Sequence, residues 1–207
     1  MAAATPTAPL VPTQAASVAV RVAALVESLE ADAMNVLELS DVVAGAFGED
    51  GARAGEAFRD TGGVGKLAGM LQWWNMLAPS TTHLPEILEL REVVLELIGN
   101  LCSNAVDPAS SLTKRLLLQW GGATPLFACL QLADVNVLRL TCGALQNICH
   151  DPAWCEVAII NGAHASFERL LDHPDSLVVR YASGCDSTTG LDCAVPPLLP
   201  ASLPPPP

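Results

Sequence analysis

The chain has 207 residues, of which 51% are apolar, 4% aromatic and 15% charged, which suits one domain of ordinary size. Ten Lys and Arg stand against 22 Asp and Glu, a net charge of −12. This balance argues against nucleic acid and anionic membranes as partners, because both are bound mainly through Lys and Arg. Mean hydropathy is +0.38, but proline, glycine or polar residues interrupt each long uncharged stretch, so no membrane span is expected.

The first segment, residues 1–14, has three prolines and no charged residue. It lacks the charged start of a secretory signal, and the arginines of a transit peptide are also missing. We predict a disordered, low-complexity N-terminus. Cytoplasm or nucleus is the expected location.

The middle of the chain contains internal repeats. Residues 90–102 and 137–149 both end in Asn, an apolar residue and Cys, and residues 178–184 begin a third copy. Glycine-containing pairs at Gly62-Gly63, Gly121-Gly122 and Asn161-Gly162 each separate two apolar helical runs. Two markers in the same order, roughly 40 to 47 residues apart, indicate a helical repeat array.

Local signals define one repeat. Asp134 is a predicted N-cap for a long helix, and Asp151-Pro152 and Thr124-Pro125 are each expected to open a short one. Each repeat therefore consists of a short helix, a glycine turn, a second helix, a polar turn and a long third helix. Such a unit buries its apolar faces only by stacking on its neighbours.

These residues resemble the armadillo repeat family. Residues 121–130 (GGATPLFACL) are similar to its second helix, residues 140–148 (LTCGALQNI) to its third, and residues 58–71 match a repeat boundary. The resemblance covers about 15–184. It implies an all-α, armadillo-type right-handed α-α superhelix of about three to three and a half repeats, which we assign to residues 15–185. Another helical solenoid, such as the related HEAT repeat, is the alternative.

In the armadillo family, third helices line a concave groove that binds extended peptides or partner helices, and a third-helix Asn bonds the partner's backbone. The resemblance gives this role to Asn100 and Asn147. Residues at i, i+4 and i+8 share one helix face. The predicted rows are Glu92, Glu96 and Asn100, then Arg139, Gly143 and Asn147, then Arg180 and Gly184. The alternative is that both Asn side chains brace their own turns.

The expected partner is a protein or peptide, and the acidic charge of the chain is compatible with a basic one. Glu96 and Gly143 stand where importin-alpha-like repeats place tryptophan, and the acidic charge argues against a beta-catenin-like basic groove. Glu86 and Glu89 extend the acidic row, as a solvated face or as a patch for basic ligands. Residues 140–151 also resemble Smg-type small-GTPase dissociation stimulators, which makes a GTPase regulator an alternative.

No catalytic, cofactor or metal site is predicted. The segment 62–66 lacks the first glycine and the Ser/Thr of a phosphate-binding loop. Cys142, Cys149, His150 and Cys155 do not have a zinc spacing. We read the cysteines of the apolar runs as buried free thiols. The prediction is a non-catalytic protein-binding scaffold.

The tryptophans are expected to pack between repeats. Trp73 and Trp74 are adjacent and must point to different sides of a helix, while Trp120 precedes a glycine pair and Trp154 follows Pro152. If Trp73 or Trp74 is exposed, it is a candidate hot spot for a partner.

The third copy stops after Gly184, and residues 186–207 lead into a proline-rich run, LLPASLPPPP. Proline favours an extended, solvated chain, so this segment is predicted to be disordered. A solenoid needs a polar cap over its last layer, and none is evident. We therefore expect a truncated array or an incorrect gene end.

Overall fold

The computed structural model describes residues 17–28, 34–46, 48–77 and 84–189, and within these ranges all regular structure is helical. The elements are α1 (Val18–Ser28), α2 (Met34–Ala44), α3 (Glu49–Asp60), α4 (Gly63–Met76), α5 (Pro85–Leu101), α6 (Ser110–Gln119), α7 (Ala123–Ala128), η1 (Cys129–Gln131), α8 (Val135–Ile148), α9 (Pro152–Ile160), α10 (Ala163–Leu171) and α11 (Ser176–Thr189). The predicted all-α solenoid is confirmed.

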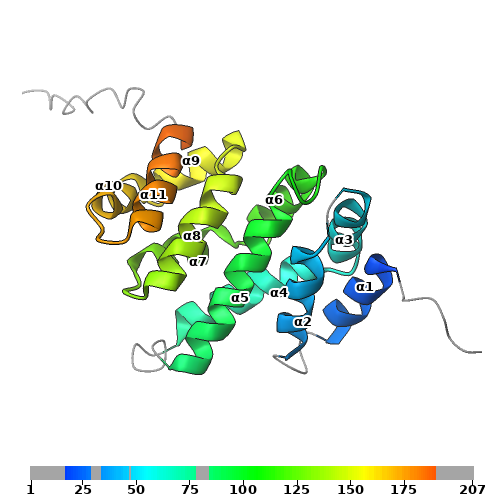
Figure 1. Ribbon diagram of the computed structural model, residues 1–207. Coiled ribbons are helices and arrows are strands. Elements are labelled where there is room, and N and C mark those ends of the chain that lie inside the picture. Colours follow the sequence, from blue (N-terminus) through cyan, green and yellow to red (C-terminus); the bar gives the residue numbers. More distant parts are fainter. Residues whose placement is uncertain (1–16, 29–33, 47, 78–83, 190–207) are drawn as a thin grey trace, which may run out of the picture.

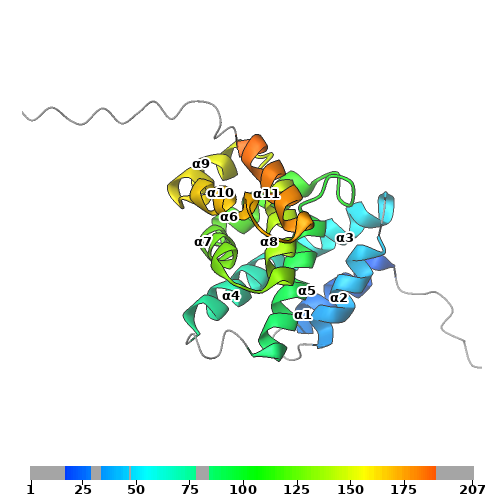
Figure 2. The same ribbon diagram turned by 60° about the vertical axis from the view of Figure 1, so that its left-hand side comes forward.

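The helices are arranged in repeated units. Helices α3–α5, α6–α8 and α9–α11 form three-helix units, and the pair α1–α2 precedes them. Helices α2, α5, α8 and α11 pack side by side in that order, as Figure 1 shows. In the turned view of Figure 2, α4, α7 and α10 are stacked along the other side. Within the row from α2 to α11, α5 and α8 are therefore each packed between two neighbouring helices.

The glycine turns lie where the sequence places them. Gly62, Gly121 and Gly162 have φ angles of 77°, 74° and 66°, in the left-handed region that glycine adopts without steric cost. Each reverses the chain between the first and second helix of a unit. This conformation explains why the glycine marker recurs once per repeat.

Two of the three predicted caps are confirmed. Asp134 accepts a hydrogen bond from the Val137 amide at 2.9 Å, and Asp151 accepts one from Ala153 at 3.0 Å. The prediction at Thr124 is wrong. The turn at Gly121 passes directly into α7 at Ala123, so Thr124 already lies inside the first helical turn.

One continuous apolar core runs through the stack, from Val22 in α1 to Cys185 in α11. Within it, α5 and α8 pack directly against each other. A Cβ atom on Gly99 would stand only 3.6 Å from Ala144 Cα, so two small residues let the helices meet. The thiols of Cys102, Cys129, Cys142 and Cys149 are buried in this core, as predicted, and the thiol of Cys185 is buried there as well.

A buried ion pair holds the loop after α5 against α3. Arg59 Nη1 donates to Asp107 Oδ2 and, at 3.0 Å, to Thr113 Oγ1. Asp107 is fully buried and also accepts from the Ala109 amide at 2.8 Å. A Cβ on Gly55 would overlap this carboxylate. The pair therefore joins the first helices of successive units through their loop.

Among the described residues of the predicted repeat region, helices follow one another up to and beyond residue 185. Residues 186–189, predicted to begin a disordered tail, form the last turn of α11. The physical reason is that no helix breaker follows Gly184 until Gly190. The predicted disordered segments 1–14 and 190–207 lie outside the described residues. Among the helices described, none combines the length and apolar character required to cross a bilayer.

Candidate functional site

A groove of about 630 Å³ lies over the third helices. Its walls come from α5, α8 and α11. Five of the six predicted site residues line it, namely Glu92, Glu96, Asn100, Arg139 and Asn147. This is the face on which the sequence predicts partner binding.

Helix α5 provides the acidic wall. Because α5 is unbroken from Pro85 to Leu101, Glu92, Glu96 and Asn100 succeed one another at one turn each on the groove side. Glu96 is exposed, whereas Glu92 and Asn100 are half-buried. The opposite face of α5 is buried in the core.

Helix α8 provides the facing wall, and its Asn147 is already bonded. Asn147 Nδ2 donates to the backbone carbonyl of Gly99 in α5 at 3.1 Å. This is a bond between neighbouring units, not a brace of its own turn. Gly143 lies one helical turn earlier, and a Cβ on it would meet the ring of Tyr181 at 3.9 Å. The ring of Tyr181 thus covers the small residue.

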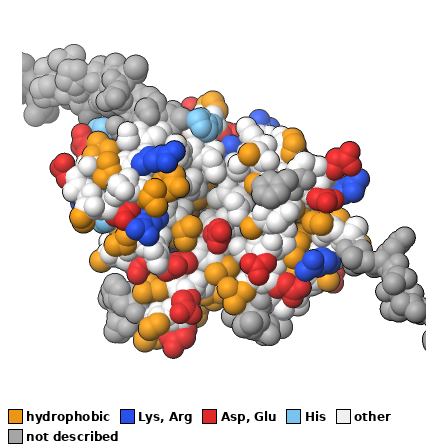
Figure 3. Space-filling view, in the orientation of Figure 1, with side chains coloured by type: hydrophobic (Ala, Val, Ile, Leu, Met, Phe, Trp, Pro, Cys, Tyr) orange, Lys and Arg blue, Asp and Glu red, His pale blue; other side chains and the backbone are white. Residues whose placement is uncertain are grey.

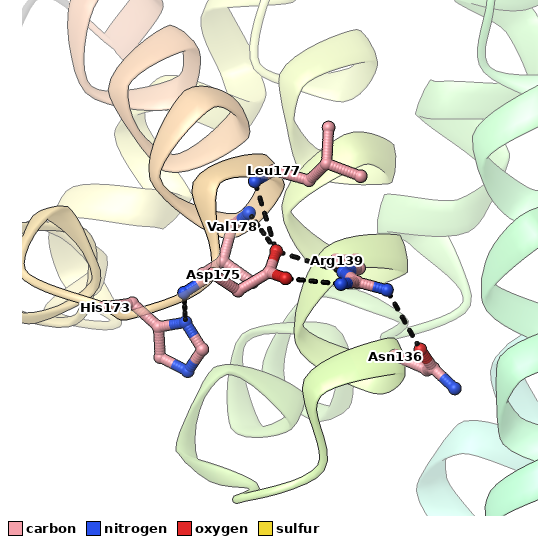
Figure 4. A network of polar contacts seen from close by, with 6 residues as sticks. All are labelled: Asn136, Arg139, His173, Asp175, Leu177 and Val178. Carbon is pink, nitrogen blue, oxygen red and sulfur yellow. Dashed lines mark hydrogen bonds and ion pairs between the residues drawn. The ribbon is translucent and has the colours of Figure 1, made fainter.

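Arg139 is held by the next unit. Its Nε donates to Asp175 Oδ1 at 3.0 Å and its Nη2 to Asp175 Oδ2, a two-bond geometry that fixes the guanidinium plane. Asp175 Oδ1 also accepts from the amides of Leu177 and Val178 at 3.1 Å each, and so caps α11 (Figure 4). His173 Nδ1 accepts from the Asp175 amide at 3.1 Å.

These bonds explain the acidity of Asp175. The hydrogen bond from Arg139, together with those from the Val178 and Leu177 amides, holds the pKa of the Asp175 carboxyl well below its ordinary value of 3.8. Asp175 therefore stays ionised, and its charge offsets that of Arg139. Because Arg139 is the one Arg in the groove lining, little uncompensated positive charge remains there.

A polar side chain of α8 contacts Arg139 on the groove side. Arg139 Nη1 donates to Asn136 Oδ1 at 3.4 Å. Burial raises the pKa of Glu92, hydrogen bonding by Asn136 lowers it, and the charges of Asp134 and Glu89 raise it further. The net direction is upward, mainly because burial disfavours the charged carboxylate.

The groove also contains lining residues that sequence reasoning missed, and it omits Arg180 and Gly184, which were predicted to begin its third row. Leu177 and Tyr181 line it from α11, whereas Arg180 is exposed and lies outside the lining. Residues 177 and 181 are one turn apart and face α8. Within the described residues no third helix follows α11, so the face carrying Arg180 has no opposite wall. Tyr181, the one tyrosine of the sequence, directly follows Arg180 and could have been noticed.

The surface around the groove is acidic. Glu86 and Glu89 extend the α5 row beyond the lining residues and are exposed. Figure 3 shows acidic side chains gathered over the lower centre of this face, where Figure 1 places α5. Among the described residues, no three His, Cys, Asp or Glu side chains cluster closely enough to hold a metal ion.

Several solved structures have the same architecture. An engineered protein superposes with a TM-score of 0.65 at 21% identity, covering 82% of this chain and 62% of its own. A designed armadillo repeat protein in complex with the peptide (KR)4 gives 0.62 at 17% identity, over 81% and 63%. A computationally designed armadillo repeat protein for modular peptide recognition gives 0.61 at 19%, also over 81% and 63%.

The chain has an armadillo-type repeat fold. At these identities the likeness concerns the fold alone, and the armadillo subfamily is not assigned. The chain spans somewhat less than two thirds of the length of the engineered armadillo proteins that it matches. No protein-family model matches the sequence, and no curated protein matches it.

Proposed function

We propose that this armadillo domain is a non-catalytic scaffold that binds an extended peptide or a partner helix in the groove over α5, α8 and α11. The carrying observation is the groove itself, which is about 630 Å³ and combines polar side chains with an apolar floor that includes Leu95 and Ala144. Designed armadillo proteins of the same fold recognise peptides, which supports a peptide as the ligand.

The two predicted Asn residues have different parts in this proposal. The side-chain amide of Asn147 already donates a hydrogen bond to the Gly99 carbonyl. Asn100 lines the groove one turn beyond Glu96, and among the described residues it makes no such bond between helices. Asn100 is therefore the residue that offers its amide to a partner's backbone, and Asn147 keeps the two walls at a fixed spacing.

The charge distribution favours a basic partner. Glu92 and Glu96 lie along one wall, Glu89 extends this row beyond the lining, and the charge of the facing Arg139 is offset by Asp175. Burial is the main cause of the raised pKa of Glu92, and the charges of Asp134 and Glu89 add to it, so a cation placed nearby would favour the ionised carboxylate. The complex of a designed armadillo protein with (KR)4 supports Lys/Arg peptides as ligands of such a groove.

Fluorescence anisotropy with a labelled (KR)4 peptide tests the proposal. Glu92→Gln/Glu96→Gln should weaken binding about three- to tenfold, because each exposed charge pair is worth roughly 0.2–1 kcal/mol. Added salt should weaken binding by the native chain more than binding by this variant. The matched control is Glu56→Gln, an exposed carboxylate on α3 outside the groove lining. Equal affinities for all three proteins would refute a groove that selects basic peptides.

Regulation of a small GTPase is a weaker candidate. It depends on residues 140–151, and most of the apolar side chains there are buried, including Cys142, Leu145, Ile148 and Cys149. The shared pattern is therefore carried mainly by core positions, which many armadillo repeats need for packing. A nucleotide-release assay with labelled GDP tests this candidate directly.

A further inference from the structure

Two of the tryptophans are exposed on a different face. Trp73 and Trp120 are 54% and 59% exposed, whereas Trp74 is 1% exposed and Trp154 is fully buried. Trp74 lies under Arg91, whose guanidinium carbon stands 5.5 Å from the ring centroid. Exposing two indoles is unfavourable without a ligand, and tryptophan is enriched at binding hot spots.

The two exposed indoles border one groove. It has a volume of about 640 Å³ and runs along α4, with Trp73 in its lining and Trp120, from the end of α6, beside it. The indole of Trp120 lies on Gly65, where a Cβ would stand 3.0 Å from Trp120 Cε2. Gln72 Nε2 donates to the Trp120 carbonyl at 2.8 Å and fixes this turn against α4.

The floor of this tryptophan groove is backbone. Gly65 and Gly69 are one helical turn apart on α4, and a Cβ on Gly69 would meet nothing within 4 Å. Glycine weakens a helix interior relative to alanine. At a cost in helix stability, Gly65 therefore makes room for the indole of Trp120 and Gly69 leaves open space beside it.

The tryptophan groove is nearly uncharged. Among its described lining residues, Lys66 is the one with a charged side chain, and Lys66 Nζ donates to the Val26 carbonyl at 2.9 Å, at the end of α1. The tryptophan groove shares no lining residue with the groove over the third helices. A ligand here is recognised by apolar contact and by stacking on indole, not by charge.

The same chain contains a segment with this chemistry. Residues 196–207, PPLLPASLPPPP, have no charged side chain. Proline runs favour polyproline II, whose φ is fixed in advance, and aromatic-lined grooves bind such helices through prolines three residues apart. Pro197/Pro200 and Pro204/Pro207 have this spacing. At ~3.1 Å per residue, an extended chain from Thr189 reaches about 25 Å at Pro197 and about 56 Å at Pro207.

We propose that the tryptophan groove on α4 binds residues 196–207 of this chain as a polyproline II helix, with its prolines stacked on Trp73 and Trp120. The proposal concerns a face and a ligand other than those of the proposed peptide scaffold. Its function is to occupy two indoles that would otherwise be exposed to solvent.

Indole N–H signals in ¹H–¹⁵N NMR spectra of the full chain test this binding. One variant replaces Pro196, Pro197, Pro200 and Pro204–Pro207 by serine and leaves the helices untouched. The Trp73 and Trp120 signals should move in this variant, while those of the buried Trp74 and Trp154 stay in place. A synthetic peptide of residues 196–207 should then move both signals back towards their native positions. Unchanged Trp73 and Trp120 signals would overturn the proposal.

A second variant blocks the groove without removing a tryptophan. Gly69→Leu places a side chain into open space and replaces glycine by a better helix former. Gly69→Leu should weaken binding of the synthetic peptide of residues 196–207 at least tenfold. Trp73→Ala should weaken it to a similar extent. Met76→Leu is the control, since Met76 is 84% exposed on the same helix and outside the groove lining. Full peptide affinity in both Gly69→Leu and Trp73→Ala, with native Trp154 signals, would also overturn the proposal.

Discussion

Asn147 donates a hydrogen bond to the backbone carbonyl of Gly99, which joins α8 to α5 at 3.1 Å. The bond lies beside the close contact between Gly99 and Ala144. An Asn at this position of a third helix therefore has a structural use before any ligand arrives. Asn100, its counterpart on α5, lines the same groove.

The two Asn residues should respond differently to truncation. Asn147→Ala should lower the free energy of unfolding by about 1 kcal/mol, since it removes one hydrogen bond that is partly shielded from water. Asn100→Ala should change stability by less than about 0.5 kcal/mol and should reduce peptide binding. Urea unfolding followed by circular dichroism measures the first effect. Equal destabilisation by both substitutions would contradict the assignment.

The ion pair between Arg59 and Asp107 under the α5–α6 loop should contribute more to stability than an exposed ion pair does. Asp107→Ala leaves Arg59, which is 9% exposed, without its buried partner, so a loss of about 3–5 kcal/mol is expected. The control is Glu49→Ala, whose partner Arg53 is 56% exposed, where about 0.5 kcal/mol or less is expected. Chemical denaturation of both variants provides the comparison. A small effect at Asp107 would mean that water reaches the guanidinium.

Acidification should test the link between Arg139 and Asp175. The folded-state pKa of Asp175 lies below its ordinary value of 3.8, so this carboxylate stabilises the fold above about pH 4. As pH falls from there towards the folded pKa, the unfolded chain takes up a proton that folded Asp175 does not, and the contribution is lost. Asp175→Asn should therefore differ from the native chain in its urea midpoint at pH 7, and the difference should shrink as pH falls from about 4 to 2. A constant difference would argue against the ion pair.

The thiols should be protected in the folded chain. Burial raises the pKa of Cys129 to about 11 and those of Cys102, Cys142 and Cys149 to about 12. At pH 8 very little thiolate is present on them, and the thiolate is the reactive form. Alkylation with iodoacetamide followed by peptide mass spectrometry should label them only after denaturation. Half-buried Cys155, whose pKa is also raised, should react slowly in the native chain. Rapid native labelling of Cys142 would show that the α8–α11 contact opens readily.

The repeat architecture could be read from the sequence because its determinants are local. Asp134, Asp151 and the turn glycines act on atoms within a few residues of themselves. They therefore leave a pattern that recurs once per unit. The prediction at Thr124 was wrong because the position of a cap depends on where the helix begins. The turn at Gly121 leads into α7 at Ala123, one residue before Thr124.

The details of the groove depend on distant pairs, which the sequence does not reveal. Arg139 was predicted as a partner contact, but its guanidinium is held by Asp175 in the following unit. Tyr181 enters the groove because α11 presents that side to α8, which only the packing of the two helices decides. The exposure of Trp73 and the burial of Trp74 likewise follow from which side of α4 meets the core.

The bond between Arg139 and Asp175 limits how such a protein can be rebuilt. The arginine belongs to one unit and the carboxylate that orients it belongs to the loop that opens the third helix of the next. A unit moved to another place in a stack would leave half of this contact behind, and its guanidinium would turn towards whatever the new neighbour offered. The interchangeable piece is therefore the junction between two units, with its arginine and its aspartate together.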